Sequence, residues 1–184
     1  LMDYSRIRNG GLRAIELVEG DSLINVLLTN GEQNVLIGTR NGMAIQFIER
    51  DVRGMGRTAR GVRGIRLNSG DYVIGACIAP HDGELLVVTE NGYGKKTPFS
   101  EYKIQTRGGK GIFTYRITDK TGKLAGLTEV EPTDDIMLIT SDGVLIRTES
   151  SEISTYGRQT QGVKIMRLDD GVKLVSMAKT PHED

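Results

Sequence analysis

The feature that most constrains this chain is an internal repeat of about fifty residues. Asn-Gly or Asp-Gly pairs occur at Asn41-Gly42, Asn91-Gly92 and Asp142-Gly143, so the three glycines follow one another at steps of 50 and 51 residues. Each pair follows an apolar run, and a threonine stands three positions before each glycine. Such pairs favour two-residue type I′ hairpins, in which both central residues have positive φ. The sequence therefore predicts three copies of one β-hairpin.

A second set of glycines recurs at the same step. Gly11, Gly61, Gly111 and Gly162 each precede a segment in which apolar and polar residues alternate, which indicates a half-buried strand. No window has a sustained helical period, so we expect very little helix. The expected strands are 12–17, 62–67, 112–117 and 163–168, with Ile15 and Leu17, Ile65 and Leu67, Tyr115 and Ile117, and Met166 and Leu168 facing inward.

Four strands in about fifty residues is the size of one propeller blade. We therefore expect an all-β, propeller-like partial ring of four-stranded blades that covers residues 1–184 as a single repeat domain. Because only three hairpins accompany four copies of the other strands, the chain is interpreted as part of a longer ring or spiral. The expected blades are 12–61, 62–111, 112–162 and a partial 163–180, with the end of a preceding repeat at 1–11.

Other residues argue against a membrane protein or an enzyme. No stretch approaches the eighteen apolar residues of a membrane span, and the N-terminus shows no signal-peptide pattern. The single cysteine, Cys77, lies in an apolar run, which indicates a buried small hydrophobe and suits a reducing cytoplasm. His81 and His182 have no partners at metal-ligand spacing, and no nucleophile–base arrangement stands out. We therefore expect no catalytic residue, metal or cofactor in this chain.

The formal net charge of zero hides a segregation of charge with the same period. Acid-free windows rich in arginine and lysine straddle the repeating glycines, at 4–15, 52–70, 102–118 and 153–168. In a ring, equivalent positions would form a continuous basic belt, which suits the phosphate backbone of duplex DNA. Bending 20–30 bp around such a disc costs on the order of 1–6 kcal/mol, so several contacts per blade are needed. The alternative is that these residues only protect exposed strand edges from aggregation.

The third window contains the loop Gln105-Thr106-Arg107-Gly108-Gly109-Lys110-Gly111. Its glycines would let the main chain approach a phosphate closely, with Arg107 and Lys110 beside the amides. It is not a nucleotide-binding P-loop, because the GxxxxGK[ST] pattern and a following helix are absent. The equivalent segments 56–61 and 157–162 share an arginine and a glycine four residues apart.

This heptapeptide resembles the Q-R-R-G-G-K-G box of the C-terminal domain of the bacterial DNA gyrase A subunit, and so do segments 61–67, 91–97 and 152–158. The resemblance covers essentially the whole chain. It implies the last four blades of a six-bladed β-pinwheel, whose blades exchange strands and whose rim wraps DNA to support ATP-dependent negative supercoiling. Two departures are Thr106, where the box has a basic residue, and the position of the loop in a late blade, whereas the principal box of the family lies in the first.

The basic windows and the resemblance together give the expected DNA contacts. Lys95 stands where the other hairpins have Ile45 and Ile146, so either a local bulge or an added phosphate contact explains it. Asp51, Glu101 and Glu152 recur just before the loops and are expected to orient loop backbone or an arginine. The candidate contacts are Arg57, Arg60, Arg63, Lys95, Lys96, Lys103, Gln105, Arg107, Gly108, Gly109, Lys110, Gly111, Arg158 and Lys164.

The resemblance also implies the partners. They are double-stranded DNA, the gyrase B subunit, and the rest of the gyrase A polypeptide, and ATP and magnesium would be bound elsewhere in the holoenzyme. Two alternatives remain open. One is the equivalent domain of topoisomerase IV, which steers substrate choice without strong wrapping, and the other is a non-catalytic propeller scaffold for protein interaction.

Overall fold

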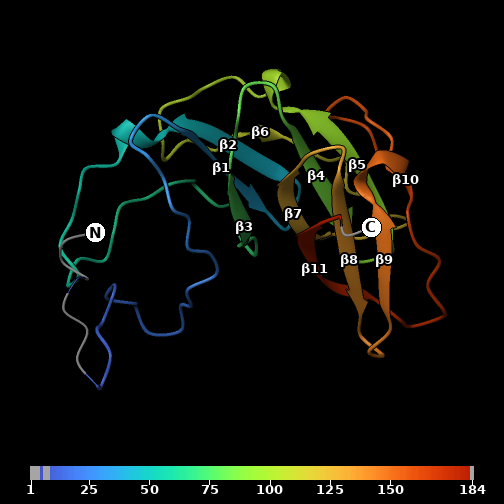
Figure 1. Cartoon of the computed structure of the whole chain (residues 1–184), viewed down its shortest axis with the longest axis horizontal. Helices are drawn as coiled ribbons and strands as arrows, with labels where there is room; N and C mark the ends of the chain where they lie inside the picture. Colours follow the sequence, from blue (N-terminus) through green and yellow to red (C-terminus); the bar gives the residue numbers. More distant parts are fainter. Residues whose placement is uncertain (1–4, 6–8, 183–184) are drawn as a thin grey trace.

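Strands make up nearly all of the regular structure in the computed structural model, which describes residues 5 and 9–182. They form three antiparallel sheets that follow one another along an arc (Figure 1). Among residues 5 and 9–182, the helical elements are the single-turn 3₁₀ helices η2 (Glu49–Asp51), η3 (Phe99–Glu101) and η4 (Ser150–Glu152). The predicted all-β fold class is confirmed. Within the described ranges, no helix is long and apolar enough to cross a membrane.

Each sheet is built on one of the three predicted hairpins. A third strand pairs with the first hairpin strand, and in two sheets a two-residue strand pairs with the second. The first sheet has the order β3 (Val73–Ile78), β1 (Asn34–Thr39), β2 (Met43–Ile48), β6 (Ile112–Phe113). The second has the order β10 (Val163–Lys164), β5 (Tyr93–Pro98), β4 (Glu84–Thr89), β7 (Leu124–Val130), and the third β11 (Leu174–Pro181), β8 (Asp134–Thr140), β9 (Leu145–Glu149).

A complete sheet therefore takes its strands from successive repeats of the sequence. The third strand begins 39 to 40 residues after the hairpin strand that it joins, and the two-residue strand begins 69 to 70 residues after its own partner strand. Because segment 102–117 lies between β5 and β7 in the chain but supplies β6 to the first sheet, neighbouring sheets are linked by exchanged strands. The repeat in the sequence and the sheet in space are therefore different units.

The hairpin turns differ from the expected type I′. In the first, Gly42 has a φ of 82° and every non-glycine residue described has a negative φ, so Asn41 does not enter the left-handed region. The Gly42 N–H donates to the Thr39 carbonyl at 3.1 Å, which gives a type I turn followed by a left-handed glycine. The buried Thr39 hydroxyl accepts from the Met43 N–H at 3.3 Å. Thr89 and Thr140 bond the equivalent N–H groups, which explains the recurring threonine.

Two of the four strands expected after the recurring glycines are absent. Segments 12–17 and 62–67 are not strands, nor is the apolar segment 23–28, whereas β6 and β10 form at the equivalent positions. No hairpin strand of the described residues lies at the offset before these segments that separates β6 and β10 from their partners. The exposed side chains of Leu17 (47%) and Leu67 (41%) contradict their predicted burial, whereas Ile65, Tyr115 and Met166 are buried as predicted. Of the expected preceding repeat 1–11, only residues 5 and 9–11 are described.

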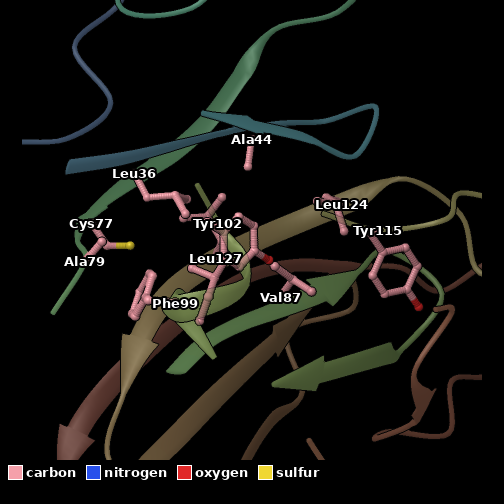
Figure 2. Close-up of a cluster of buried hydrophobic side chains, with 11 residues drawn as sticks. Leu36, Ala44, Cys77, Ala79, Val87, Phe99, Tyr102, Tyr115, Leu124 and Leu127 are labelled. Atoms are coloured by element: carbon pink, nitrogen blue, oxygen red, sulfur yellow. The ribbon is translucent and has the colours of Figure 1, made fainter. Parts of the chain in front are cut away.

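Two main apolar clusters join the three sheets. The first lies between the first and second sheets, and Figure 2 shows Leu127 within it, with Leu36 and Cys77 toward one side and Val87 toward the other. A Cβ on Gly38 would lie 2.0 Å from a Leu127 methyl carbon, so the close approach of the two sheets depends on this glycine. Cys77 is 1% exposed, which confirms its predicted burial, and burial raises the pKa of its thiol.

Candidate nucleic-acid interface

The Gly-rich loop Gln105–Gly111, the box loop, lies between the first sheet and the segment 62–67. At one end, the Gln105 N–H donates to the Gln46 carbonyl of β2 at 2.8 Å. In the middle, Gly108 donates to the Gly64 carbonyl at 2.5 Å, and the Gly109 carbonyl accepts from the Arg66 N–H at 2.7 Å. The loop is therefore fixed by main-chain hydrogen bonds on both sides.

The loop formed by residues 157–162, the late loop, occupies the equivalent place on the second sheet. The Tyr156 N–H donates to the Lys96 carbonyl of β5 at 2.8 Å, as Gln105 does to Gln46. Both loops end in a glycine with positive φ, and a Cβ on Gly111 would lie 2.3 Å from the Ala44 carbonyl oxygen. Gly162 has the same relation to Gly94, at 2.2 Å. The recurring glycine is thus required because the loop backbone touches a strand backbone.

The equivalent arginines Arg57, Arg107 and Arg158, the loop arginines, share one contact inside the fold. Their Nη1 atoms donate to the main-chain carbonyls of residues 13, 63 and 113, at 3.4, 3.1 and 2.8 Å, and these acceptors occupy equivalent positions in successive repeats. Nε of Arg107 also donates to the Asp51 carbonyl at 2.9 Å. A guanidinium has five N–H donors, so these contacts leave donors for phosphate. Their direct DNA contact stays a prediction, and the structure gives each of them a role in joining the loop to the preceding repeat.

Two of the predicted DNA contacts, Lys95 and Lys96, are buried. Lys95 is 0% exposed and Lys96 only 6% exposed. The Lys96 Nζ lies 3.0 Å from the Glu84 carboxylate, and that of Lys95 donates to carbonyls of the late loop. The prediction that these lysines contact DNA is therefore corrected, because both side chains are directed into the packed structure and their ammonium groups are bonded there. The alternative of a bulge is also wrong, since β5 pairs with β4 in regular register here.

The remaining predicted basic residues are exposed to solvent. They are Arg60, Arg63, Lys103, Lys110 and Lys164. Arg60 forms an ion pair with Glu16 at 3.0 Å, and Lys164 places its Nζ 5.4 Å from the centre of the Tyr93 ring. Gln105 and the glycines of the box loop are half-buried, and their contribution would come from shaping the loop.

The predicted DNA contacts left out a row of exposed arginines that lie in the basic windows at equivalent positions. Arg66, Arg116 and Arg167, the arginine row, each follow a buried residue by one position, so their side chains point away from the core. The main-chain N–H groups of Arg66 and Arg116 bond the loop carbonyls of Gly109 (2.7 Å) and Thr160 (3.5 Å). None of the three forms an ion pair within the described part of the chain. Their spacing of 50 and 51 residues was the signal that could have found them.

Of the three recurring acids, Glu101 bonds the loop with its carboxylate as predicted, whereas Asp51 and Glu152 make other contacts. The Glu101 carboxylate accepts from the Arg158 N–H at 3.0 Å and lies 3.9 Å from its Nε, as expected of a group that orients the loop. Asp51 contributes its main-chain carbonyl to Arg107, and the Glu152 carboxylate accepts from the Thr148 hydroxyl at 2.9 Å. Among the described residues, no group of three or more histidine, cysteine or acidic side chains could hold a metal ion.

The fold and this periodic basic surface define a strand-exchanging, propeller-like repeat domain. The chain belongs to the family described as the DNA gyrase C-terminal domain, a beta-propeller, whose model matches residues 3–30, 33–76, 83–131 and 134–181. The last three matched segments each begin at or just before the first hairpin strand of a sheet and end within, or one residue after, the third strand of that sheet.

Individual relatives agree with this assignment. The DNA gyrase A protein of Staphylococcus epidermidis is 47% identical over 186 residues, which cover all of this chain and 21% of that protein. The chain thus spans about a fifth of the length of this relative. A crystal structure of the C-terminal domain of DNA topoisomerase IV has a TM-score of 0.91 and 26% identity, over 97% of this chain and 56% of that one. A DNA gyrase A C-terminal domain has a TM-score of 0.84 and 29% identity, over 92% and 58%.

Proposed function

We propose that this domain binds duplex DNA without sequence preference, bends it along the arc of sheets, and so supports ATP-dependent negative supercoiling by DNA gyrase. The observation that carries the proposal is the set of exposed basic residues at equivalent positions of successive repeats. The arginine row heads this set, with Arg63, Lys103, Lys110 and Lys164 beside it. Membership in the gyrase C-terminal domain family supports the same function.

The chemistry of these residues suits a phosphate backbone better than base recognition. Each phosphate neutralised by arginine or lysine releases condensed counterions, so affinity accumulates over many weak contacts and falls steeply with salt. The main-chain N–H groups of Arg66 and Arg116 are bonded to the loops, which places these two side chains beside them. Contacts of this kind position a duplex and read no sequence.

The partners follow from the same proposal. Double-stranded DNA would lie on this domain. The gyrase B subunit would hydrolyse ATP, and the rest of the gyrase A polypeptide would take part in strand passage. We infer that the chain itself is not catalytic, that ATP and magnesium are bound elsewhere in the holoenzyme, and that the protein acts in the cytoplasm.

A ligation assay tests the proposal. Nicked circular DNA is sealed in the presence of increasing amounts of the chain, and the topoisomers are separated by electrophoresis. Wrapping predicts a shift in linking number that grows with protein and disappears when salt rises from 50 to 200 mM. Binding that does not change over this salt range would overturn the role of the basic surface.

The high TM-score with a topoisomerase IV domain favours a second candidate, a domain that binds DNA without wrapping it strongly. The same assay separates the two functions. Salt-sensitive binding without a change in linking number would favour the second candidate.

A further inference from the structure

Lys95 is fully buried beneath the late loop, and its ammonium group is fully hydrogen-bonded there. Nζ donates to the carbonyls of Gly157 at 2.5 Å and Arg158 at 2.6 Å, and to the Thr160 hydroxyl at 3.3 Å. These three acceptors match the three N–H donors of an ammonium group. Nζ also lies 5.4 Å from the centre of the buried Tyr115 ring, whose negative face attracts a cation.

The peptide plane between Arg158 and Gln159 shows what this burial does to the loop. Carbonyl and N–H groups of a trans peptide point in opposite directions, so an Arg158 carbonyl aimed at Lys95 turns the Gln159 N–H away from it. Gln159 is exposed, and its N–H makes no hydrogen bond within the described part of the chain. The equivalent N–H of the box loop, that of Gly108, is used inside the fold, donating to Gly64 at 2.5 Å.

We propose that the late loop is a phosphate subsite, in which Lys95 is a positioning residue that turns the Gln159 N–H outward and places a positive charge directly beneath the loop. The ligand would be one phosphodiester group of duplex DNA, received by this N–H beside the Arg158 guanidinium. Main-chain N–H groups backed by a cation are a common way to bind a phosphate. This inference rests on the proposed DNA-binding function and adds a subsite to it.

The groups around Lys95 make its charge sensitive to pH. Glu101 faces it from the end of η3, Arg158 from the late loop and Tyr115 from segment 112–117. Burial lowers the pKa of Lys95 to about 8, helped by Arg158 and opposed by Glu101. A neutral amine has only two N–H donors and would turn a lone pair toward one of its three oxygen acceptors. Deprotonation would therefore remove the charge and release part of the loop.

The test measures the affinity of the chain for a random-sequence duplex by fluorescence anisotropy, at constant ionic strength, between pH 6.5 and 9.5. We expect the affinity of the wild-type chain to fall about three- to tenfold as the pH rises through 8. Lys95→Met, which keeps an unbranched side chain without charge, should bind about three- to tenfold more weakly at pH 7 and show no such fall. Lys95→Arg, which stays charged throughout, should restore binding and also remove the pH dependence.

Each result decides for or against the subsite. A wild-type profile that is flat across pH 8, or a folded Lys95→Met chain that binds like the wild type, would overturn it. If Lys95→Met does not fold, the profiles of the wild-type and Lys95→Arg chains decide alone. Failure of the wild-type chain to bind DNA at pH 7 in 50 mM salt would instead reject the proposed function itself.

Discussion

The box loop and the late loop make the same main-chain contacts on supports of different chemistry. Both bond a hairpin strand at one end, accept an N–H from the arginine row, and end in a glycine packed on a strand carbonyl. Beneath the box loop lie the buried side chains of Ile45 and Ile65, and a Cβ on Gly109 would lie 3.5 Å from the Ile45 methyl carbon. Beneath the late loop lie Lys95 and Tyr115, which both donate to its carbonyls.

This difference explains the sequences of the two loops. With apolar support, the box loop makes two main-chain hydrogen bonds to segment 62–67, through the Gly108 N–H and the Gly109 carbonyl, and Gly108 takes a φ of 80°. With a cation as support, the late loop turns carbonyls inward. It has Gln159 and Thr160 at the positions where the box loop has Gly108 and Gly109. The same backbone arrangement thus gives two different loops. The box loop uses its Gly108 N–H inside the fold, and the late loop directs the equivalent Gln159 N–H outward.

The largest expected loss of stability comes from placing a lysine beneath the box loop. Ile45→Lys would bury an ammonium group in the apolar cluster of Ile45, Phe47 and Ile65, so we expect a loss of about 3–5 kcal/mol in the free energy of unfolding. Ile45→Met, which keeps the site apolar, should cost less than about 1.5 kcal/mol. Urea unfolding followed by circular dichroism measures both. Equal losses in the two variants would mean that support for the box loop depends on shape and not on polarity.

The closing glycines should be the next most sensitive positions. Gly111→Ala combines a φ of 75° with a Cβ only 2.3 Å from the Ala44 oxygen, so we expect a loss of about 2–4 kcal/mol. Gly143 has a φ of 86° but no atom within 4 Å of an added Cβ, so Gly143→Ala should cost only about 1 kcal/mol. The same unfolding experiment compares them. A Gly111→Ala loss no greater than that of Gly143→Ala would show that the loop can move off the strand.

The repeat in the sequence was sufficient to predict the hairpins, the all-β fold and the buried partners Ile65, Tyr115 and Met166. It was not sufficient to predict which strands would form, because β6 and β10 pair with hairpin strands from another repeat, whereas segments 12–17 and 62–67 have no such partner among the described residues. Nor could it show that Lys95 faces inward, since a lysine in a strand is ordinarily exposed and its acceptors come from a loop 62 to 65 residues away. Charge periodicity located the basic surface but did not separate the loop arginines, whose guanidinium groups bond carbonyls, from the arginine row, whose guanidinium groups point away from the core.

Because Lys95 lies beneath the late loop and not beneath the box loop, only the late loop should make stability depend on pH. The pKa of Lys95 is about 8 in the folded chain and 10.5 when unperturbed, so between these values the unfolded chain binds more protons. The free energy of unfolding should therefore rise with pH across this window, by on the order of 2 kcal/mol from this group. DNA affinity should fall over the same range, so the two trends oppose each other. Urea unfolding at pH 7.5, 9 and 10 measures the first trend, and Lys95→Met should lack it.

The smallest effects separate the two sets of arginines. Arg107→Ala removes two hydrogen bonds to the Asp51 and Arg63 carbonyls, so we expect a stability loss of about 1–2 kcal/mol. Arg116→Ala removes an exposed side chain and should change stability by less than about 0.5 kcal/mol. It should lower the slope of log affinity against log salt by about one contact. Thermal unfolding and DNA titrations at several salt concentrations measure both properties. If Arg116→Ala left the slope unchanged while Arg107→Ala reduced it without loss of stability, the loop arginines and not the arginine row would hold the phosphates.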